Sequence, residues 1–138
     1  MCMVSSQITR SKLVNLNLKS VESLKTLLFT STKAYSEGQS IAAEIAVMIA
    51  RNRKRVVLLD ADFHRPSVHQ LFNLPNRVGM ADVLLGKHLL SSVIHSVDNN
   101  HLFIMTAGIK NNGKTNLIAS QKMSEILLYL ENSFDKVI

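Results

Sequence analysis

The chain has 138 residues, 46% hydrophobic and 19% charged, which suits one globular domain with an ordinary core. Its apolar runs are too short to span a membrane, the amino terminus lacks the apolar core of a signal peptide, and Cys2 is the single cysteine, so a cytoplasmic protein without internal disulfides is expected. The net charge is +6, but the one dense basic run, residues 51–55, contains no aromatic residue that could stack on bases. A basic run is also favoured at the end of a helix, so we expect no nucleic-acid partner.

The first quarter of the chain predicts an arm, a strand, a turn and a helix. Residues 1–25 are polar with scattered leucine and valine, and we expect them to form an N-terminal arm or amphipathic helix. The domain itself is expected over residues 26–138 and opens with a short strand at 26–30. After a polar turn, Ser40 is of a residue type that favours an N-cap. A helix is then indicated by apolar residues that recur on one face, Ile41, Ile45, Met48 and Ile49.

Two aspartates follow the next expected strand. Residues 56–59 are four consecutive apolar residues, as in a buried strand of a parallel sheet. Asp60 and Asp62 come directly after it, at i and i+2, which places both on one side of the carboxyl edge where open α/β sheets bind ligands. The alternative is a structural acidic turn that ends at Arg65 and Pro66. The residues alone leave both interpretations open.

The remainder alternates helical and strand patterns. Short helices are predicted at 67–72 and 80–85, and a further one at 89–97; strands are predicted at 102–105 and 136–138, and a loop at 107–116. The last helix is indicated by an apolar face made of Met123, Ile126, Leu127 and Leu130. This alternation predicts an α/β fold: a doubly wound, mostly parallel sheet with helices on both faces.

The turn before the first long helix lies where a phosphate-binding loop belongs, because backbone N–H groups at a helix N-terminus attract anions. It reads Ser-Glu-Gly-Gln-Ser-Ile over residues 36–41. Together with residues 59–76 and 79–86, it closely resembles the bacterial tyrosine kinases of capsule and exopolysaccharide biosynthesis, P-loop ATPases related to MinD and ParA. The resemblance runs from about Ser23 to Ile138.

The resemblance implies a site for ATP and Mg²⁺ and the transfer of phosphate to tyrosine. By position, Asp60 and Asp62 match the family's catalytic acidic pair, and Ser40 and Asp60 match its metal ligands. The residues implied to bind the nucleotide are Glu37, Gly38, Gln39, Ser40 and Ile41. The resemblance also implies a membrane-embedded polysaccharide co-polymerase as partner, a location at the inner face of the plasma membrane, and a homo-oligomer, although only Arg10 matches the family's oligomerisation motif.

This sequence departs from the family at its phosphate loop. Ser36 replaces the first glycine and Gln39 replaces the lysine whose charge meets the phosphates. The family's metal-binding aspartate would follow Ile138 directly, and its tyrosine cluster would come later, so the kinase domain is expected to be incomplete at its C-terminus. We therefore expect ATP binding and phosphotransfer to be weakened or lost. The alternatives are a pseudokinase that acts as an interaction module and a partitioning ATPase of the ParA/MinD kind.

A second loop competes for the phosphate-binding role. Residues 108–115, Gly-Ile-Lys-Asn-Asn-Gly-Lys-Thr, match the complete P-loop pattern after one expected strand and before an expected helix. A P-loop normally opens a sheet and is followed by its metal-binding strand, whereas this pattern stands close to the end of the sequence. We interpret the match as chance in an Asn-rich loop.

Overall fold

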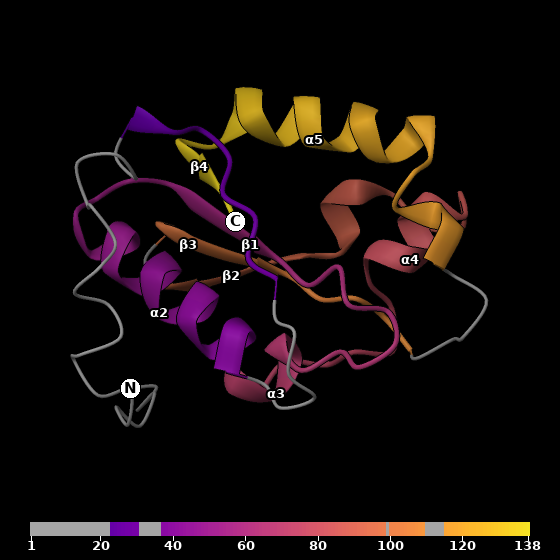
Figure 1. The fold of residues 1–138 in the computed structure, drawn as a ribbon, viewed down its shortest axis with the longest axis horizontal. Coiled ribbons are helices and arrows are strands. Elements are labelled where there is room, and N and C mark those ends of the chain that lie inside the picture. The colour runs from indigo at the N-terminus through magenta and orange to yellow at the C-terminus, as the bar shows by residue number, and fades with distance from the viewer. Residues whose placement is uncertain (1–22, 31–36, 99, 110–114) are drawn as a thin grey trace.

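The computed structural model describes residues 23–30, 37–98, 100–109 and 115–138 (Figure 1). Almost all of the expected N-terminal arm and most of the polar turn before the first long helix lie outside these residues, as does most of the P-loop-like pattern in residues 108–115. No helix among the described residues combines the length and apolar character that crossing a membrane requires.

The core of the fold is a four-stranded sheet. Its strands are β1 (Val56–Leu59), β2 (Ile94–Asp98), β3 (Leu102–Met105) and β4 (Lys136–Val137), in the order β2-β3-β1-β4. Strand β1 pairs in parallel with β3 and with β4, whereas β2 pairs antiparallel with β3. The strands predicted at 56–59, 102–105 and 136–138 are thus confirmed, and the sheet is mostly parallel.

The strand predicted at 26–30 is present only as a short parallel contact beside β4. Thr26 forms an isolated bridge with Val137, and Leu27 N–H donates to the Val137 carbonyl at 2.9 Å. Because β4 extends only over Lys136–Val137, the ladder is limited to this bridge. The chain nevertheless enters the domain alongside β4, next to the sheet.

Helices cover both faces of the sheet, as Figure 1 shows, and this confirms the doubly wound α/β architecture. The helices are α2 (Glu37–Arg51), α3 (Val68–Leu71), α4 (Met80–Leu84) and α5 (Gln121–Ser133), with 3-10 turns at Leu90–Ser92 and Thr115–Leu117. Successive residues of β1 point to opposite faces. Val56 and Leu58 join the cluster of α2 and α3, whereas Val57 joins the cluster of α4 and α5.

Two local predictions are wrong. Ser40 is not an N-cap, because α2 begins at Glu37 and Ser40 lies in its first turn. The helix expected at 89–97 is instead a 3-10 turn followed by β2, which pairs Ile94 with Met105 and Ser96 with Phe103. The hydrogen bonds to β3 determine this structure, since pairing with a neighbouring strand overrides a weak helical pattern.

Candidate functional site

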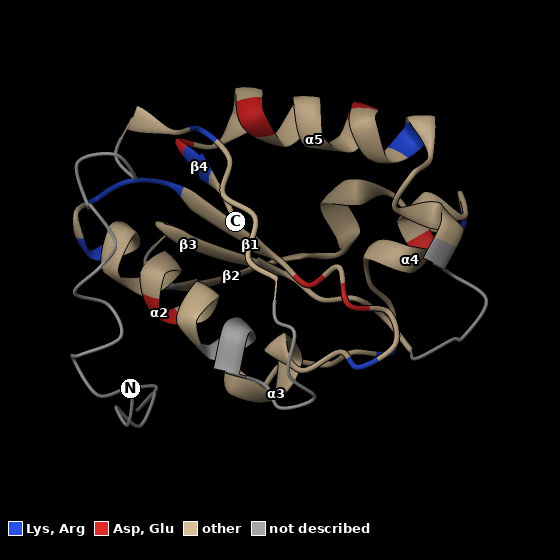
Figure 2. Cartoon of the chain, in the orientation of Figure 1, with Lys and Arg blue, Asp and Glu red and all other residues tan. Residues whose placement is uncertain are grey.

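Asp60 lies at the carboxyl end of β1 and is 3% exposed. Its N–H extends the ladder by donating to the Met105 carbonyl at 3.0 Å. Its carboxylate accepts three backbone N–H bonds: Oδ1 from Asp62 at 3.1 Å, and Oδ2 from Ser67 at 2.9 Å and Val68 at 3.0 Å. The side chain thus fastens the segment after β1 to the start of α3. The acidic positions after β1 are visible in Figure 2.

Burial raises the pKa of Asp60 above its usual value of 3.8. The three N–H bonds act in the opposite direction, and the negative charge of Asp62 raises the pKa further. The carboxylate therefore bears a desolvation cost that its hydrogen bonds do not fully offset. A bound cation would offset part of that cost, so the electrostatics of the site favour a positively charged ligand.

Asp62 is half-buried, and its carboxylate organises the turn that follows. Oδ1 accepts from the N–H groups of His64 at 3.1 Å and Arg65 at 2.9 Å, which is the pattern of an Asx turn. The two aspartates therefore form an acidic turn, which was the alternative interpretation of the sequence. They also remain side by side at the edge where open α/β sheets bind ligands, so the turn itself is the candidate site.

The acidic pair fits Mg²⁺ better than a metal that needs a cage of protein ligands. Among the described residues, no group of three or more His, Cys, Asp or Glu side chains could hold a metal ion. Mg²⁺, however, is commonly bound by one or two carboxylates together with water and substrate phosphates. Asp60 Oδ2 already accepts two N–H bonds, whereas Oδ1 accepts one and retains acceptor capacity.

The start of α2 lies at the same edge of the sheet as Asp60. Helix α2 ends at Arg51, shortly before β1 begins, so its N-terminus is at the carboxyl end of β1. Helix α2 also contacts α3, whose first amides bind Asp60. The backbone of Glu37, Gly38, Gln39 and Ser40 forms the first turn of α2, and Ile41 follows, half-buried. The fold thus brings the elements that carry both halves of the predicted site to one edge.

Residues 110–114 of the P-loop-like pattern lie outside the described residues, and the contacts described on either side of them differ from those of a phosphate loop. Gly108 is held by Asn76, whose side chain accepts from the Gly108 N–H and donates to its carbonyl, both at 2.8 Å. Helix α5 begins only at Gln121, after a 3-10 turn, and is capped by Ser120. In a P-loop the helix begins at the end of the pattern. These contacts favour a chance match.

The sequence did not predict the pair of hydrogen bonds between Asn76 and Gly108, which we call the clamp. Gly79 adds to it, because a Cβ there would lie 2.2 Å from Gly108 N and 2.4 Å from the Thr106 carbonyl oxygen. This close approach allows the Met80 N–H to donate to the Thr106 carbonyl oxygen at 2.7 Å. The available signals were the two glycines and an asparagine in loops, and they do not show which loops meet.

Comparison with known proteins identifies relatives along most of the chain. The chain is 31% identical to the tyrosine-protein kinase YwqD of Bacillus subtilis over 98% of its own length and 57% of that protein. It is 32% identical to the putative tyrosine-protein kinase CapB of Staphylococcus aureus, over 83% of the chain and 50% of the relative. No family model matches. The chain spans about half the length of these curated relatives.

Solved structures share the fold. The chimerical protein CapA2B2 superposes with a TM-score of 0.80 at 26% identity, covering 88% of this chain and 54% of that one. The kinase domain of the Escherichia coli tyrosine kinase ETK superposes with a TM-score of 0.77 at 26% identity, over 83% of this chain and 45% of that one. MinD from Pyrococcus horikoshii, solved with Mg-ADP, is 17% identical with a TM-score of 0.68 over 82% of this chain and 46% of that one, and shows the shared fold alone. The chain is therefore a homologue of the bacterial tyrosine kinases, with the α/β fold of their P-loop kinase domain over the part that it spans.

Proposed function

We propose that the chain is the nucleotide-binding part of a tyrosine-kinase-like protein of capsule or exopolysaccharide biosynthesis. The observation that carries this proposal is the buried carboxylate of Asp60 at the carboxyl end of β1, with Asp62 beside it and the start of α2 at the same edge. Homology to tyrosine kinases supports ATP as the nucleotide and the tyrosine hydroxyl as the acceptor.

In this proposal the two halves of the site have different tasks. Backbone N–H groups at the start of α2, from Glu37 to Ser40, bind the phosphates, because a helix N-terminus favours negative charge. Asp60 and Ser40 would hold Mg²⁺, which would neutralise charge on the phosphates. Asp62, fixed by the turn that it organises, orients the attacking hydroxyl.

Gln39 sets the expected activity. A lysine at this position of a phosphate loop places a positive charge on the phosphates, and phosphate transfer depends on stabilising the charge that develops there. A neutral amide cannot supply that charge. We therefore expect weak binding of Mg-ATP and slow phosphotransfer, and the missing lysine also supports a second candidate function, a pseudokinase that regulates a partner.

Domain organisation and partners follow from the same homology. We propose that residues 26–138 form the kinase-like domain and residues 1–25 an N-terminal arm. A membrane polysaccharide co-polymerase is the proposed partner, and it would place the chain at the inner face of the membrane. A homo-oligomer is a further proposal, supported by the homology alone.

Titration calorimetry with Mg-ATP tests the nucleotide site. The wild-type chain should bind, and Asp60→Asn should weaken binding by about tenfold, which corresponds to about 1.4 kcal/mol. The control is Glu125→Gln, which neutralises an exposed carboxylate on α5 that accepts from Gln121 and has no part in the proposed site. Equal affinity for all three proteins would contradict the placement of the site. Transfer of labelled phosphate to a tyrosine peptide by the wild-type chain would exclude the pseudokinase.

A further inference from the structure

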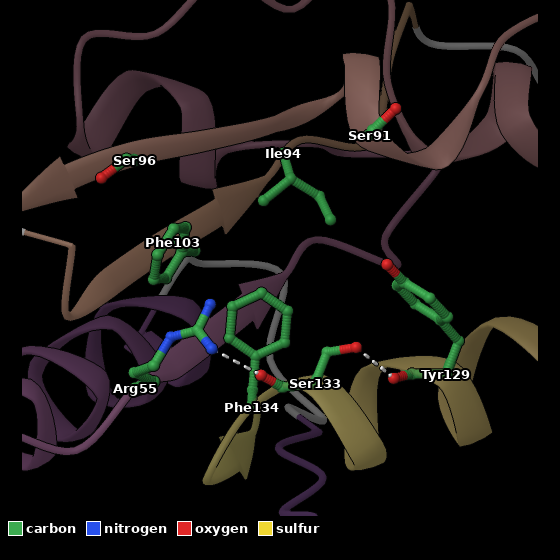
Figure 3. Close-up of a pocket in the computed structure, with 8 residues that line it drawn as sticks. All are labelled: Arg55, Ser91, Ile94, Ser96, Phe103, Tyr129, Ser133 and Phe134. Atoms are coloured by element: carbon green, nitrogen blue, oxygen red, sulfur yellow. Dashed lines mark hydrogen bonds between the residues drawn. The ribbon is translucent and has the colours of Figure 1, made fainter.

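A groove of about 270 Å³ lies between α5 and the β2–β3 edge of the sheet. Figure 3 shows the residues around it, among them Arg55 before β1, Ile94 on β2, Phe103 on β3, and Tyr129 and Phe134 on and after α5. Arg55 precedes β1 whereas Asp60 follows it, and none of the residues that line the groove belongs to the candidate nucleotide site. The groove is therefore a separate feature of the molecule.

The Arg55 guanidinium is held in the groove by two aromatic rings. Its central carbon lies 5.4 Å from the centre of the Phe103 ring and 5.1 Å from that of Phe134, and the two rings meet edge to face at 5.0 Å. One of its nitrogens donates to the Ser133 carbonyl at 3.1 Å. Stacking on rings fixes a guanidinium in place without using its in-plane donors. The charge is thus pre-positioned at the wall of the groove.

This positive charge has no acidic counterpart in the part of the chain that the structure describes. The acidic residue Asp135, which is close in space, accepts from the Arg55 backbone N–H at 2.7 Å, and no ion pair with the guanidinium is formed among the described residues. The polar residues that line the groove contribute hydroxyl groups, from Ser91, Ser96 and Tyr129. A guanidinium has five N–H donors in a fork that matches a carboxylate.

Charge argues against a second copy of the chain, and against residues 1–22, as the occupant. A second copy carries the same net charge of +6. Residues 1–22, which are not described, contain three basic residues, Arg10, Lys12 and Lys19, and one acidic residue, Glu22. Both would bring like charge to Arg55. The complementary occupant is an acidic segment.

Size and composition indicate a peptide. Small-molecule pockets usually have volumes of about 300–1,000 Å³, so this groove suits one or two side chains better than a cofactor. Tyrosine, phenylalanine and arginine are the residues enriched at the centres of protein interfaces, and Tyr129 is 58% exposed at the groove. We propose that the groove docks an acidic segment of a partner protein, with a carboxylate on Arg55 and an apolar side chain against Ile94 and the phenyl rings.

The fluorescence of Tyr129 provides a direct test. The chain has two tyrosines and no tryptophan, so in a Tyr35→Phe background Tyr129 is the single strong fluorophore. The probe is a short acetylated and amidated peptide in which Asp and Glu flank one phenylalanine. Its control has Asn and Gln at the acidic positions. The acidic peptide should change the fluorescence saturably below about 1 mM, and the neutral peptide should bind at least about tenfold more weakly.

Variants of the groove separate a specific site from a general attraction. Arg55→Gln should weaken binding of the acidic peptide by about tenfold. Lys54→Gln, which removes the same charge from the adjacent exposed residue, should change the affinity for that peptide by less than about twofold. Ser96→Phe inserts a ring from the exposed face of β2 and should abolish binding. Circular dichroism verifies that each variant is folded, and if Arg55→Gln unfolds, Ser96→Phe decides the question.

Several results would overturn the proposal. These are no fluorescence change up to about 1 mM peptide, equal binding of the neutral peptide, equal losses for Arg55→Gln and Lys54→Gln, or unchanged binding by Ser96→Phe. Sedimentation provides the last test. If the chain self-associates and Ser96→Phe abolishes that association, the occupant is a second copy and not an acidic partner.

Discussion

Replacing Asp60 with alanine removes the acceptor of three backbone N–H bonds at once. The bond from Val68 is buried, so its N–H would be left without an acceptor, at a cost of about 1–3 kcal/mol. The bonds from Ser67 and Asp62 are partly buried, so water can replace the carboxylate there and each loss costs about 0.5 kcal/mol. The substitution also removes the buried carboxylate and its desolvation cost, which raises the Asp60 pKa, and this offsets part of the lost stability. We expect Asp60→Ala to lower the free energy of unfolding by about 2–3 kcal/mol.

Urea unfolding followed by far-ultraviolet circular dichroism measures this change, because the chain lacks tryptophan. Asp60→Asn is the matched variant. It keeps one acceptor oxygen, so it should cost about 1 kcal/mol. If the free energy of unfolding of Asp60→Ala lies within about 0.5 kcal/mol of the wild-type value, or above it, the carboxylate does not hold the segment between β1 and α3 as described.

Three further results are expected. Gly79→Ala should destabilise the fold by about 3 kcal/mol or more, measured by the same urea unfolding, because its Cβ would lie 2.2 Å from Gly108 N. Gly86→Ala should cost only about 1 kcal/mol, because its Cβ would meet only the Lys122 Nζ at 3.5 Å and the cost comes from its φ of +74°. Ser120→Ala should cost about 1 kcal/mol by removing the N-cap of α5, and thermal unfolding detects it. The pKa of Asp60 is raised above 3.8, so the stability that its protonation contributes is present in acid and is lost as pH rises through its folded pKa. The loss of unfolding free energy caused by Asp60→Ala should therefore be larger near pH 3.8 than at neutral pH. An equal loss at both pH values would contradict the raised pKa.

The sequence predicted the elements whose burial follows from local pattern. The run at Val56–Leu59 has no alternation, as expected of a strand covered on both faces, and Val57 and Leu58 are indeed buried in opposite clusters. The apolar face of α5 likewise predicted its buried residues Met123, Ile126 and Leu130. These elements carry their own signal because one face of each is apolar over several turns or residues.

Other features depend on contacts that are distant in sequence. Strand β2 lies at the edge of the sheet and has half-buried and exposed residues, so little but its pairing with β3 marks it as a strand. The clamp between Asn76 and Gly108 joins residues 32 positions apart. The aspartates were placed correctly at the end of β1, but their hydrogen bonds to the turn and to α3 could not be read from spacing.

The central claim is that the edge formed by Asp60 and the start of α2 is a nucleotide site weakened by Gln39. Gln39→Lys tests it most directly, because it restores the positive charge that this loop lacks while leaving Asp60 unchanged. Calorimetric titration with Mg-ATP should show binding at least about tenfold tighter for Gln39→Lys than for the wild type. Equal affinity, or no binding by either protein, would contradict the claim.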